Sequence, residues 1–376
     1  MPDSYQIEIV EDFTSLQNLK KEWDELAPPR DVEPWQSFSW SEAAATAYNK
    51  NDVLRIITVR KDKRLVAITP LVVKPSAQPL SPFRVDFLGG EELKEPNRFL
   101  SLDPIATDLL LDTIVTERRY PLRLSRLPDD TDLLNSIMMK LANAGWVTRY
   151  MRLPYPYLDL GPNPLKKSLR EDLKRARRKA EAQGKVRAEA VSAANEEELL
   201  SHLREAFRIE ASGWKGRDGT AILSSEARKN FFERFACSAW RDGTLRLWFL
   251  YIDEVPVAFQ LAIESAMAFW LFKIGYDEKY EHCSPGNLLL GETIMEAAKN
   301  GLSQYHLLGK EEPWTKRWAS KSRDSYVVAA YRPNMHGVKA MTSDVLYLFK
   351  KTIIDRRTWS SLKNILRFQK GNQQCP

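Results

Sequence analysis

The residues best arranged for chemistry in this 376-residue chain lie in one stretch, 268–290, where an apolar segment turns into a helix. Residues 268–276 (AFWLFKIGY) are almost all apolar or aromatic, which is typical of a buried strand. The tripeptide Ser284-Pro285-Gly286 then predicts a helix that runs to about Lys299. Serine is a favoured N-cap, proline suits the first helical position, and glycine lets a ligand approach the backbone closely.

A helix that begins in this way can bind an anion. The N–H groups of its first turn have no intrahelical partner and lie at the positive end of the helix dipole, where phosphate is the usual ligand. We therefore predict an anion site on the four amides that follow Pro285, those of Gly286, Asn287, Leu288 and Leu289. The alternative is an ordinary capped helix after a strand. On this stretch alone that alternative is the commoner outcome, because ligand sites are few.

The elements that must position this stretch follow one order twice. Each half of the chain predicts a strand, two helices, a hairpin, a strand, a loop, a helix and a strand, so we expect a duplicated domain of the α/β (α+β) class. The linker between the halves is Gly161-Pro162-Asn163-Pro164. We expect domains at 1–162 and 163–335, and a C-terminal helix and tail at 336–376.

The two copies differ where the anion site should be. In the first half, the strand predicted at 84–88 leads into GGEELKEPNRFL. This segment is acidic and has no Ser-Pro-Gly helix start. We therefore expect only the second copy to bind a phosphate group.

The charge of the chain is concentrated in one helix. The net charge is +6, but residues 166–187 hold ten Lys or Arg and three Asp or Glu, a net of +7, so the rest is close to neutral. Leucine and alanine recur at i, i+4 spacing through the helix predicted at 165–183, which predicts that one face is packed. The basic face is a solvated surface, or a contact for tRNA or an anionic membrane.

Several classes of protein are not indicated. The three Cys are isolated and the four His are not spaced as ligands, so we expect no disulfide framework and no metal. The chain has no P-loop, dinucleotide fingerprint, GxSxG or HExxH motif. The first residues do not resemble a signal peptide, and no apolar run reaches about 18 residues, so we expect a cytoplasmic protein without a transmembrane segment.

A set of short motifs carries a family resemblance. These are SLREDLKRARRKAEAQG, FRIEASGWKGRDG, LRLWFLYIDEVPVAFQLAI, FWLFKIGYDEKYEHCSPGNLLL and LLGKEEPWTKRW, together with PWQSFSWSEAAATAY and LVAITPLVV in the first half. The set resembles the GNAT-type acetyltransferases of the CelD-like group of cellulose and exopolysaccharide biosynthesis, which is itself similar to the Fem peptidyltransferases. The chain departs from the group at Trp314-Thr315, where the family has Tyr-Lys, and Lys316 follows.

The resemblance implies tandem GNAT-like domains, each a mixed, mostly antiparallel sheet flanked by helices. The second would bind acetyl-CoA or another acyl-CoA, and the first would have no cofactor. The thioester arm would lie along Phe272, Ile274 and Gly275, and the pyrophosphate on residues 284–289, which include Ser284. Lys279 or the basic helix would supply a cation for the 3′-phosphate.

The implied reaction is acyl transfer to an amine or hydroxyl of an amino sugar or of a polysaccharide or cell-envelope precursor. It needs a base and donors for the thioester oxygen. Asp277 or Glu312, with Glu311 behind them, are the candidate bases, and His282 is an alternative. Their simpler roles are turn capping for Asp277 and plain surface charge for the two glutamates.

Two further residues are candidates for the acceptor site, and two other functions remain open. Trp214, in a glycine-rich loop, would stack on a sugar or cap the core, and Lys316 would bind the acceptor. The rival enzyme is a Fem-like aminoacyl-tRNA-dependent transferase. Outside enzymes, the chain would be a non-catalytic partner of a polysaccharide synthase.

Overall fold

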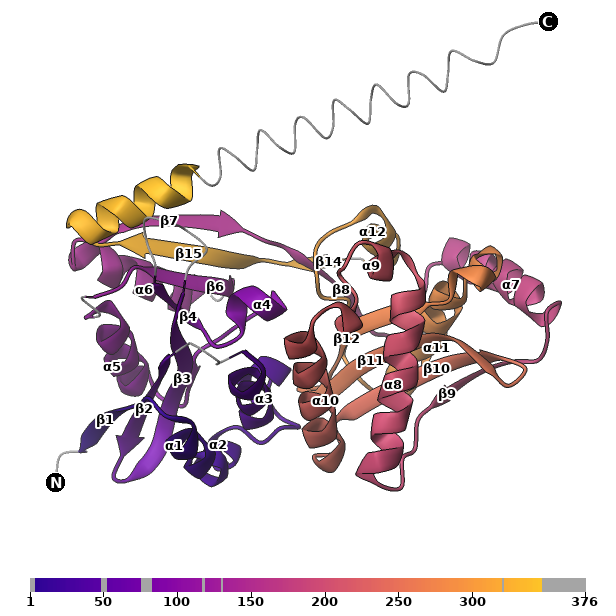
Figure 1. Cartoon of the computed structure of the whole chain (residues 1–376), viewed down its shortest axis with the longest axis horizontal. Coiled ribbons are helices and arrows are strands. Elements are labelled where there is room, and N and C mark those ends of the chain that lie inside the picture. The colour runs from indigo at the N-terminus through magenta and orange to yellow at the C-terminus, as the bar shows by residue number, and fades with distance from the viewer. Residues whose placement is uncertain are drawn as a thin grey trace, which may run out of the picture.

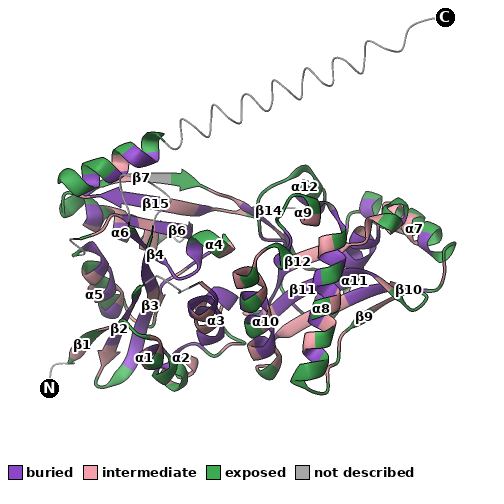
Figure 2. Cartoon of the chain, viewed as in Figure 1, coloured by how far each residue is buried: buried purple, intermediate pink, exposed green. Residues whose placement is uncertain are grey.

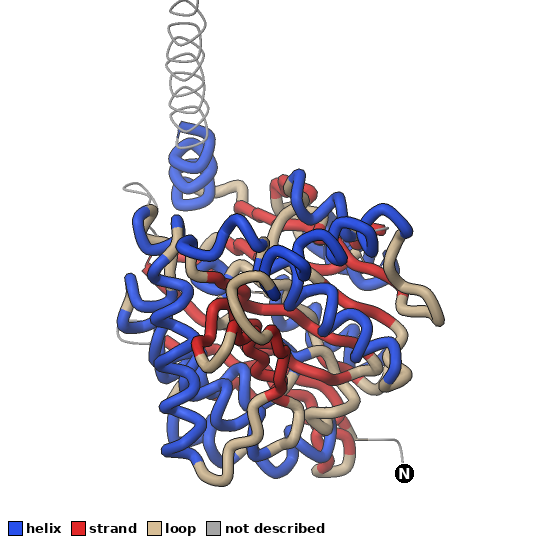
Figure 3. The backbone as a smooth tube through the Cα atoms, turned by 90° about the vertical axis from the view of Figure 1, so that its right-hand side faces the viewer, coloured by secondary structure: helices blue, strands red, loops and turns tan. Residues whose placement is uncertain are grey.

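The computed structural model describes residues 4–48, 53–75, 83–116, 119–129, 131–319 and 321–346. They form two halves that lie side by side, each with one sheet and its own helices (Figure 1). Helices cover the sheets on their outer faces, and the strands lie inside (Figure 3). The expected α/β class, with two mixed and mostly antiparallel sheets flanked by helices, is confirmed.

The first half begins with a strand and ends its first part with a hairpin, as the sequence predicts, but four helical segments lie between them where two helices were expected. Its elements are β1 (Tyr5–Val10), α1 (Phe13–Asn18), α2 (Lys20–Leu26), η1 (Pro34–Gln36), α3 (Phe38–Tyr48), β2 (Val53–Lys61), β3 (Arg64–Pro75), β4 (Phe83–Phe87), α4 (Gly90–Leu93), β5 (Leu100–Ser101), α5 (Pro104–Val115), β6 (Leu122–Pro128), α6 (Thr131–Asn143) and β7 (Val147–Arg152).

The rest of the chain repeats this order, although its first strand, β8, lies before the boundary predicted at 162, and its last strand returns to the first sheet. Its elements are β8 (Tyr155–Asp159), α7 (Lys167–Glu181), β9 (Val186–Ala190), α8 (Glu196–Ser212), α9 (Trp214–Arg217), η2 (Ile222–Ser224), α10 (Glu226–Arg241), β10 (Leu245–Ile252), β11 (Val255–Ser265), β12 (Ala268–Tyr276), η3 (Glu278–Cys283), α11 (Pro285–Lys299), β13 (Gln304–His306), α12 (Pro313–Trp318), β14 (Lys321–Arg323) and β15 (Ser325–Tyr331). A further helix runs from 335 to the end of the described residues at 346.

One prediction near the N-terminus was wrong in detail. The sequence predicts a single helix over 14–26 with Thr14 as its cap, but the helix breaks at Leu19 into α1 and α2. The cap is Asp12, whose carboxylate accepts hydrogen bonds from the N–H and hydroxyl of Ser15. Aspartate is as favourable at the N-cap as serine or threonine, so the sequence is compatible with either Asp12 or Thr14 as the cap.

The two sheets share one strand order, and each contains a strand from the other half of the chain. The first sheet runs β1-β2-β3-β4-β6-β15-β7, and the second runs β9-β10-β11-β12-β13-β8-β14. The inserted strand is β15 in the first sheet and β8 in the second. The duplication predicted from the sequence is therefore present with its inserted strands exchanged.

The chain crosses between the halves at two adjacent points. Leu153 and Ser325 exchange backbone hydrogen bonds of 2.6 and 3.2 Å, and Arg152 pairs with Asp324 at 2.6 Å. β8 precedes the boundary predicted at 162 yet pairs in the second sheet, and β15 pairs in the first. The boundaries 1–162, 163–335 and 336–376 remain a prediction of domains, and the strand pairing follows a different division.

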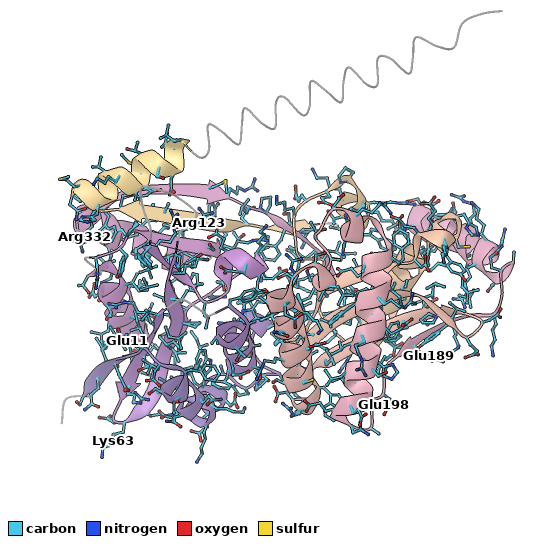
Figure 4. All side chains as sticks on the ribbon, viewed as in Figure 1. Glu11, Lys63, Arg123, Glu189, Glu198 and Arg332 are labelled. Carbon is cyan, nitrogen blue, oxygen red and sulfur yellow. The ribbon has the colours of Figure 1, made fainter. Side chains whose placement is uncertain are left out.

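An aromatic core joins the halves between α3 and α10. Trp40 of α3 lies edge-on to Phe231 and Phe235 of α10, at centroid distances of 4.9 and 5.1 Å, and 5.3 Å from Phe272 of β12. Side chains fill the space between these elements (Figure 4), and the strand interiors and facing helix surfaces are buried (Figure 2). One continuous apolar cluster spans both halves.

This core predicts that the halves unfold together. Trp40 is 2% exposed, so its replacement by alanine should lower the free energy of unfolding by about 3–5 kcal/mol. Urea denaturation followed by tryptophan fluorescence and circular dichroism should give one transition for the wild type and an earlier one for Trp40→Ala. The control Ile105→Ala alters a 57% exposed side chain and should change stability by less than about 0.5 kcal/mol. Two separate wild-type transitions would show that the junction does not couple the halves.

Candidate functional site

β12 has a partner along only part of one edge. β11 pairs with β12 along its whole length, whereas β13 pairs in parallel with only Ala268, Phe269 and Trp270. Residues 271–276 have no strand on that side within the described part of the chain. Their outward backbone groups are therefore available to an extended ligand that lies beside the strand.

A β-bulge changes the direction of the side chains at this open edge. The β11 register moves from Ala262 opposite Leu271 to Leu261 opposite Lys273, so Phe272 is the extra residue. Phe272 packs in the core that joins the halves, and Lys273 lies on the same side, with its ammonium 4.8 Å from the Phe232 ring of α10. Without the bulge, consecutive residues would point to opposite faces. The bulge thus directs a charged side chain at the junction.

Burial lowers the pKa of Lys273, against the attraction of Glu210 and, more weakly, Glu95. Glu210 of α8 is 2% exposed and is held by the ammonium of Lys215 and the backbone N–H of Ile222, at 3.0 and 2.7 Å. The cluster of Glu210, Lys215 and Lys273 therefore lies on the α8 and α10 side of β12.

Gly275 packs tightly, so the absence of a side chain there serves the fold. A Cβ at this position would lie 2.6 Å from the Phe259 ring and 3.0 Å from the Cα of Glu210. The glycine lets α8 approach the strand. Gly275 and Phe272, predicted to contact a cofactor, are both buried, and Ile274 is half-buried.

The turn into α11 differs from the predicted cap. Ser284 occupies the N-cap position, but it has a left-handed backbone (φ 52°) and its side chain makes no capping hydrogen bond. Its carbonyl accepts hydrogen bonds from Asn287 and Leu288, at 3.0 and 3.1 Å. The prediction that these two amides lack partners was therefore wrong. The amide of Gly286, a buried residue of the first helical turn, is the donor that still fits the prediction. A non-glycine residue in this conformation is strained, which is common at functional turns.

Gly286 is closely packed at the helix start. Its missing Cβ would lie 3.3 Å from Cδ1 of Tyr276 at the end of β12. The corresponding helix of the first half, α5, begins at Asp103-Pro104, and the Asp103 carboxylate accepts a hydrogen bond from the Ala106 amide at 2.7 Å. A built-in carboxylate thus occupies the anion position of the first copy, whereas the second copy has none.

The predicted acidic residues have local partners. Asp277 caps η3 through the Lys279 amide at 3.1 Å, which is the simpler role proposed for it. Glu312 caps α12 and accepts the Trp314 indole N–H at 2.7 Å. Their assignment as bases stays a prediction.

The other predicted contacts lie near the same two turns. Glu311 pairs with Lys316 at 3.6 Å, and both are exposed, as is His282. Thr315, where the family has Lys, is buried, and its hydroxyl accepts the Glu312 amide at 2.9 Å. The Trp214 backbone begins α9, but its side chain lies outside the described structure.

α9 instead brings a lysine to the open edge. Lys215 donates to the carbonyl of Ile274 at 2.6 Å and to Glu210 at 3.0 Å. The Asp277 amide bonds to Val257 of β11, so by alternation the Ile274 carbonyl faces away from β11. An ammonium group therefore lies at the unpaired edge of β12, and the sequence analysis did not select it.

The basic helix packs as predicted. Leu169 and Ala180 are buried, and a Cβ on Gly291 of α11 would meet Leu173. α7 also packs against η3, and the charge of Lys179 acts against the burial that raises the pKa of the Cys283 thiol. The C-terminal part of α7 thus lies beside the turn that begins α11.

A search against protein-family models gives the decisive match. Residues 167–316 match the acetyltransferase (GNAT) domain. This part of the chain is a GNAT-type acyltransferase domain. The predicted enzyme class is therefore confirmed at this level, and the finer assignment to the CelD-like group stays a prediction. A search of curated protein sequences returned no relative of the chain.

Solved structures with the same fold cover nearly the whole chain. The C-terminal domain of a putative lysylphosphatidylglycerol synthetase from Agrobacterium fabrum has a TM-score of 0.56 at 10% identity, over 89% of this chain and 97% of that one. FemX has a TM-score of 0.54 at 13% identity, over 84% and 96%. L-PGS from Bacillus licheniformis has a TM-score of 0.52 at 10% identity, over 86% of this chain and 95% of that one. At these identities the likeness shows a shared fold.

No group of three or more His, Cys, Asp or Glu side chains within the described residues is placed to bind a metal ion. None of the helices in the described part of the chain has the length and hydropathy needed to cross a bilayer.

The sequence analysis also missed a buried histidine beside the site. His306 of β13 stacks on Trp270 of β12 at a centroid distance of 3.9 Å, and its Nε2 lies 3.1 Å from the Gln304 side chain. The residue is 0% exposed, and burial, with a smaller contribution from Arg323, lowers its pKa to about 3. It is therefore a neutral ring that fixes β13 against β12.

This histidine predicts a pH dependence of stability. Below pH 6.5 the unfolded chain binds a proton at His306, whereas the folded chain binds that proton only near pH 3. The stability that the neutral ring contributes is therefore complete above pH 6.5 and is lost as the pH falls. Between pH 7 and pH 5 the wild type should lose about 2 kcal/mol more than His306→Phe, which retains a stacked ring. Urea titrations at both pH values measure the difference. Equal losses in the two proteins would contradict the depressed pKa.

Proposed function

We propose that the chain transfers an acyl group from acetyl-CoA or another acyl-CoA to an amine or hydroxyl of an amino sugar or of a polysaccharide or cell-envelope precursor. The observation that carries this proposal is the unpaired edge of β12 next to the uncapped start of α11. An acyl-CoA has an extended amide-containing arm with a pyrophosphate at its end. The arm would bind along the unpaired strand edge, and the pyrophosphate would bind at the helix start that follows it.

The residues at the start of α11 fit the phosphates. Gly286 has no side chain that would fill the position of the ligand, and its amide lies at the positive end of a 15-residue helix. Lys279 of η3 and Lys179 at the C-terminal part of α7 are exposed cations close to this turn, and either would pair with a 3′-phosphate. Ser284 and Asn287 complete the turn that would surround the pyrophosphate.

The residues along β12 fit the arm. The outward groups of Ile274 and its neighbours would bond to the amides of the arm, in the manner of an added strand. The Ile274 carbonyl already accepts from Lys215, and a carbonyl oxygen has a second lone pair for a further donor. When bound, the thioester would supply an activated acyl group, and the ammonium of Lys215 would stabilise negative charge near its carbonyl oxygen.

Gly286→Asp should abolish acyl-CoA binding, with a small displacement of the Tyr276 ring, which would lie 3.3 Å from the added Cβ. A carboxylate there would repel the pyrophosphate, while an acidic residue in a first helical turn is otherwise favourable. The measurement is the thermal shift with acetyl-CoA, which stabilises the folded state by about 2.7 kcal/mol at 100 times its Kd.

The matched control is Gly161→Asp. Gly161 is exposed, and a Cβ there meets nothing within 4 Å. Acetyl-CoA should therefore raise the melting temperature of this variant as much as that of the wild type. No shift of the wild type with acetyl-, succinyl- or longer acyl-CoA would count against the proposed donor. An unchanged shift in Gly286→Asp would place the phosphates elsewhere.

A second candidate function is transfer of an aminoacyl group from tRNA, and α7 is the observation that favours it. The structure describes no carboxylate within ion-pair distance of several exposed basic side chains of this region. They are Lys166, Lys167, Arg170, Lys174, Arg178 and Lys179. An array of this kind binds nucleic-acid phosphates in a salt-dependent way, although an anionic membrane would serve as well.

Charge reversal separates these functions. If tRNA binds on α7, Lys174→Glu combined with Arg178→Glu should weaken binding in a filter assay and reduce the slope of log K against log salt by about 2. The control is Lys63→Glu with Arg64→Glu, in the β2–β3 turn far from α7 (Figure 4). An equal loss of tRNA affinity in both variants, or no tRNA binding by the wild type, would argue against a tRNA-dependent transferase.

A further inference from the structure

The first half carries a buried carboxylate oxygen on the segment GGEELKEPNRFL, which lacks the phosphate site predicted for the second half. α4 ends at Lys94, whose left-handed backbone (φ 60°) turns the chain toward β6. Asn97 then fixes the segment: its amide bonds to the Arg126 carbonyl at 3.0 Å, and its side chain bonds to Glu95 and Ser125 carbonyls at 2.9 and 3.1 Å. Glu95 is thus held in a constrained turn against β6.

The carboxylate of Glu95 lacks the partner that a structural carboxylate would have. Its Oε2 has no exposure to solvent and no hydrogen-bond partner within the described residues. The charges that act on it are Arg126 of β6 and Lys273 of β12. A buried acceptor without a donor is costly and uncommon, so it needs an explanation such as a function.

Arg126 ties the segment that carries Glu95 to the second half of the chain. Arg126 is 5% exposed, and its guanidinium donates to the Lys94 and Gly309 carbonyls, at 2.5 and 3.1 Å. Gly309 lies in the loop after β13, and Lys273 is the residue that the bulge directs from β12. The Glu95 segment is therefore joined through Arg126 to the loop that follows the strand beside β12. Arg126 also has a left-handed backbone (φ 54°), a second strained residue at this place.

We propose that Glu95 of the first half is the general base of the second half's acyl transfer, and that the acceptor binds at the junction. This rests on the function proposed above. The acceptor's nitrogen or oxygen forms a bond to the acyl carbon while the C–S bond breaks and its electron pair goes to sulfur. Glu95 takes the proton that the acceptor loses, and the CoA thiolate takes up one proton.

The surroundings suit this role. Burial raises the pKa of Glu95, and Arg126 and Lys273 oppose that rise. A carboxylate with a raised pKa is a stronger base at neutral pH than an exposed one. By contrast, Asp277 and Glu312 already bind the ends of η3 and α12.

Glu95→Gln tests the proposal by two independent readouts, with Glu91→Gln as the matched control. Glu91 lies on the same segment but is 51% exposed and pairs with Lys74 at 3.3 Å. The first readout is thiol release from acetyl-CoA, with glucosamine as the probe acceptor and water without it. Glu95→Gln should retain the acetyl-CoA thermal shift and lose about 100-fold or more in kcat, and Glu91→Gln should match the wild type. A Glu95→Gln variant with wild-type kcat would overturn the proposal.

The second readout is the urea midpoint from pH 5 to pH 7.5, which needs no acceptor. A raised folded-state pKa means that the wild type loses stability as the pH rises above the ordinary value of 4.5. Glu95→Gln should therefore have the higher midpoint at pH 7.5, and its advantage should shrink toward pH 5. Burial raises the pKa of Glu91, but the charges of Lys74, Arg123 and Arg84 together outweigh burial and lower that pKa. Glu91→Gln should therefore show the opposite sign. If Glu95→Gln behaves like Glu91→Gln, Glu95 is a structural partner of Arg126 and the proposal fails. Absence of acetyl-CoA binding by the wild type would instead refute the proposed function.

Discussion

The exchange of one strand between the sheets is the constraint on which the junction depends. β8 is held between β13 and β14, and β15 between β6 and β7, so neither sheet is complete without the other half of the chain. A strand inserted in this way forms hydrogen bonds on both edges, and its removal would expose two rows of backbone groups. The halves are thus fixed relative to each other by backbone pairing as well as by side chains. A site that takes residues from both halves can have a defined geometry only because of this.

The two halves also show how one fold can keep or lose an anion site. α5 and α11 occupy equivalent places and both begin with a proline at the first helical position. In α5 the Asp103 carboxylate satisfies the helix start, which stabilises the helix and repels a phosphate. In α11 the serine backbone is left-handed and its side chain does not cap, so the helix start is less stable in itself. The loss of a cap, typically worth about 1 kcal/mol, is consistent with a position reserved for a ligand.

Local signals explain which elements could be predicted. The bounds of α8, β12, α11 and β15 follow directly from periodicity, the flanking turn residues and the Ser-Pro-Gly helix start, all of which are properties of neighbouring residues. The strand exchange could not be predicted, because Tyr155–Asp159 reads as the end of the preceding extended segment and its pairing partner β13 lies almost 150 residues away. The bulge at Phe272 depends on the β11 register, which the β12 sequence does not encode.

Glu95 was missed for a related reason. The segment GGEELKEPNRFL was compared with its counterpart in the second half and judged by the phosphate site that it lacks. Its actual neighbours come from β6 and from β12 of the other half, and those are tertiary contacts. The same holds for Lys215, whose partners Glu210 and Ile274 lie on two different elements.

The distribution of charge across the junction gives the last argument. The core around Trp40 is aromatic and would join the halves without any charged groups, since buried ion pairs seldom add stability over apolar packing. Yet Arg126, Glu210 and Lys273 are enclosed beside it, and the burial of Lys273 and Arg126 lowers the pKa of each. These charges converge from both sheets on the edge of β12 that has no strand partner. Apolar packing alone would hold the two halves together, so these buried charges support the proposal that the junction binds an acceptor and moves its proton.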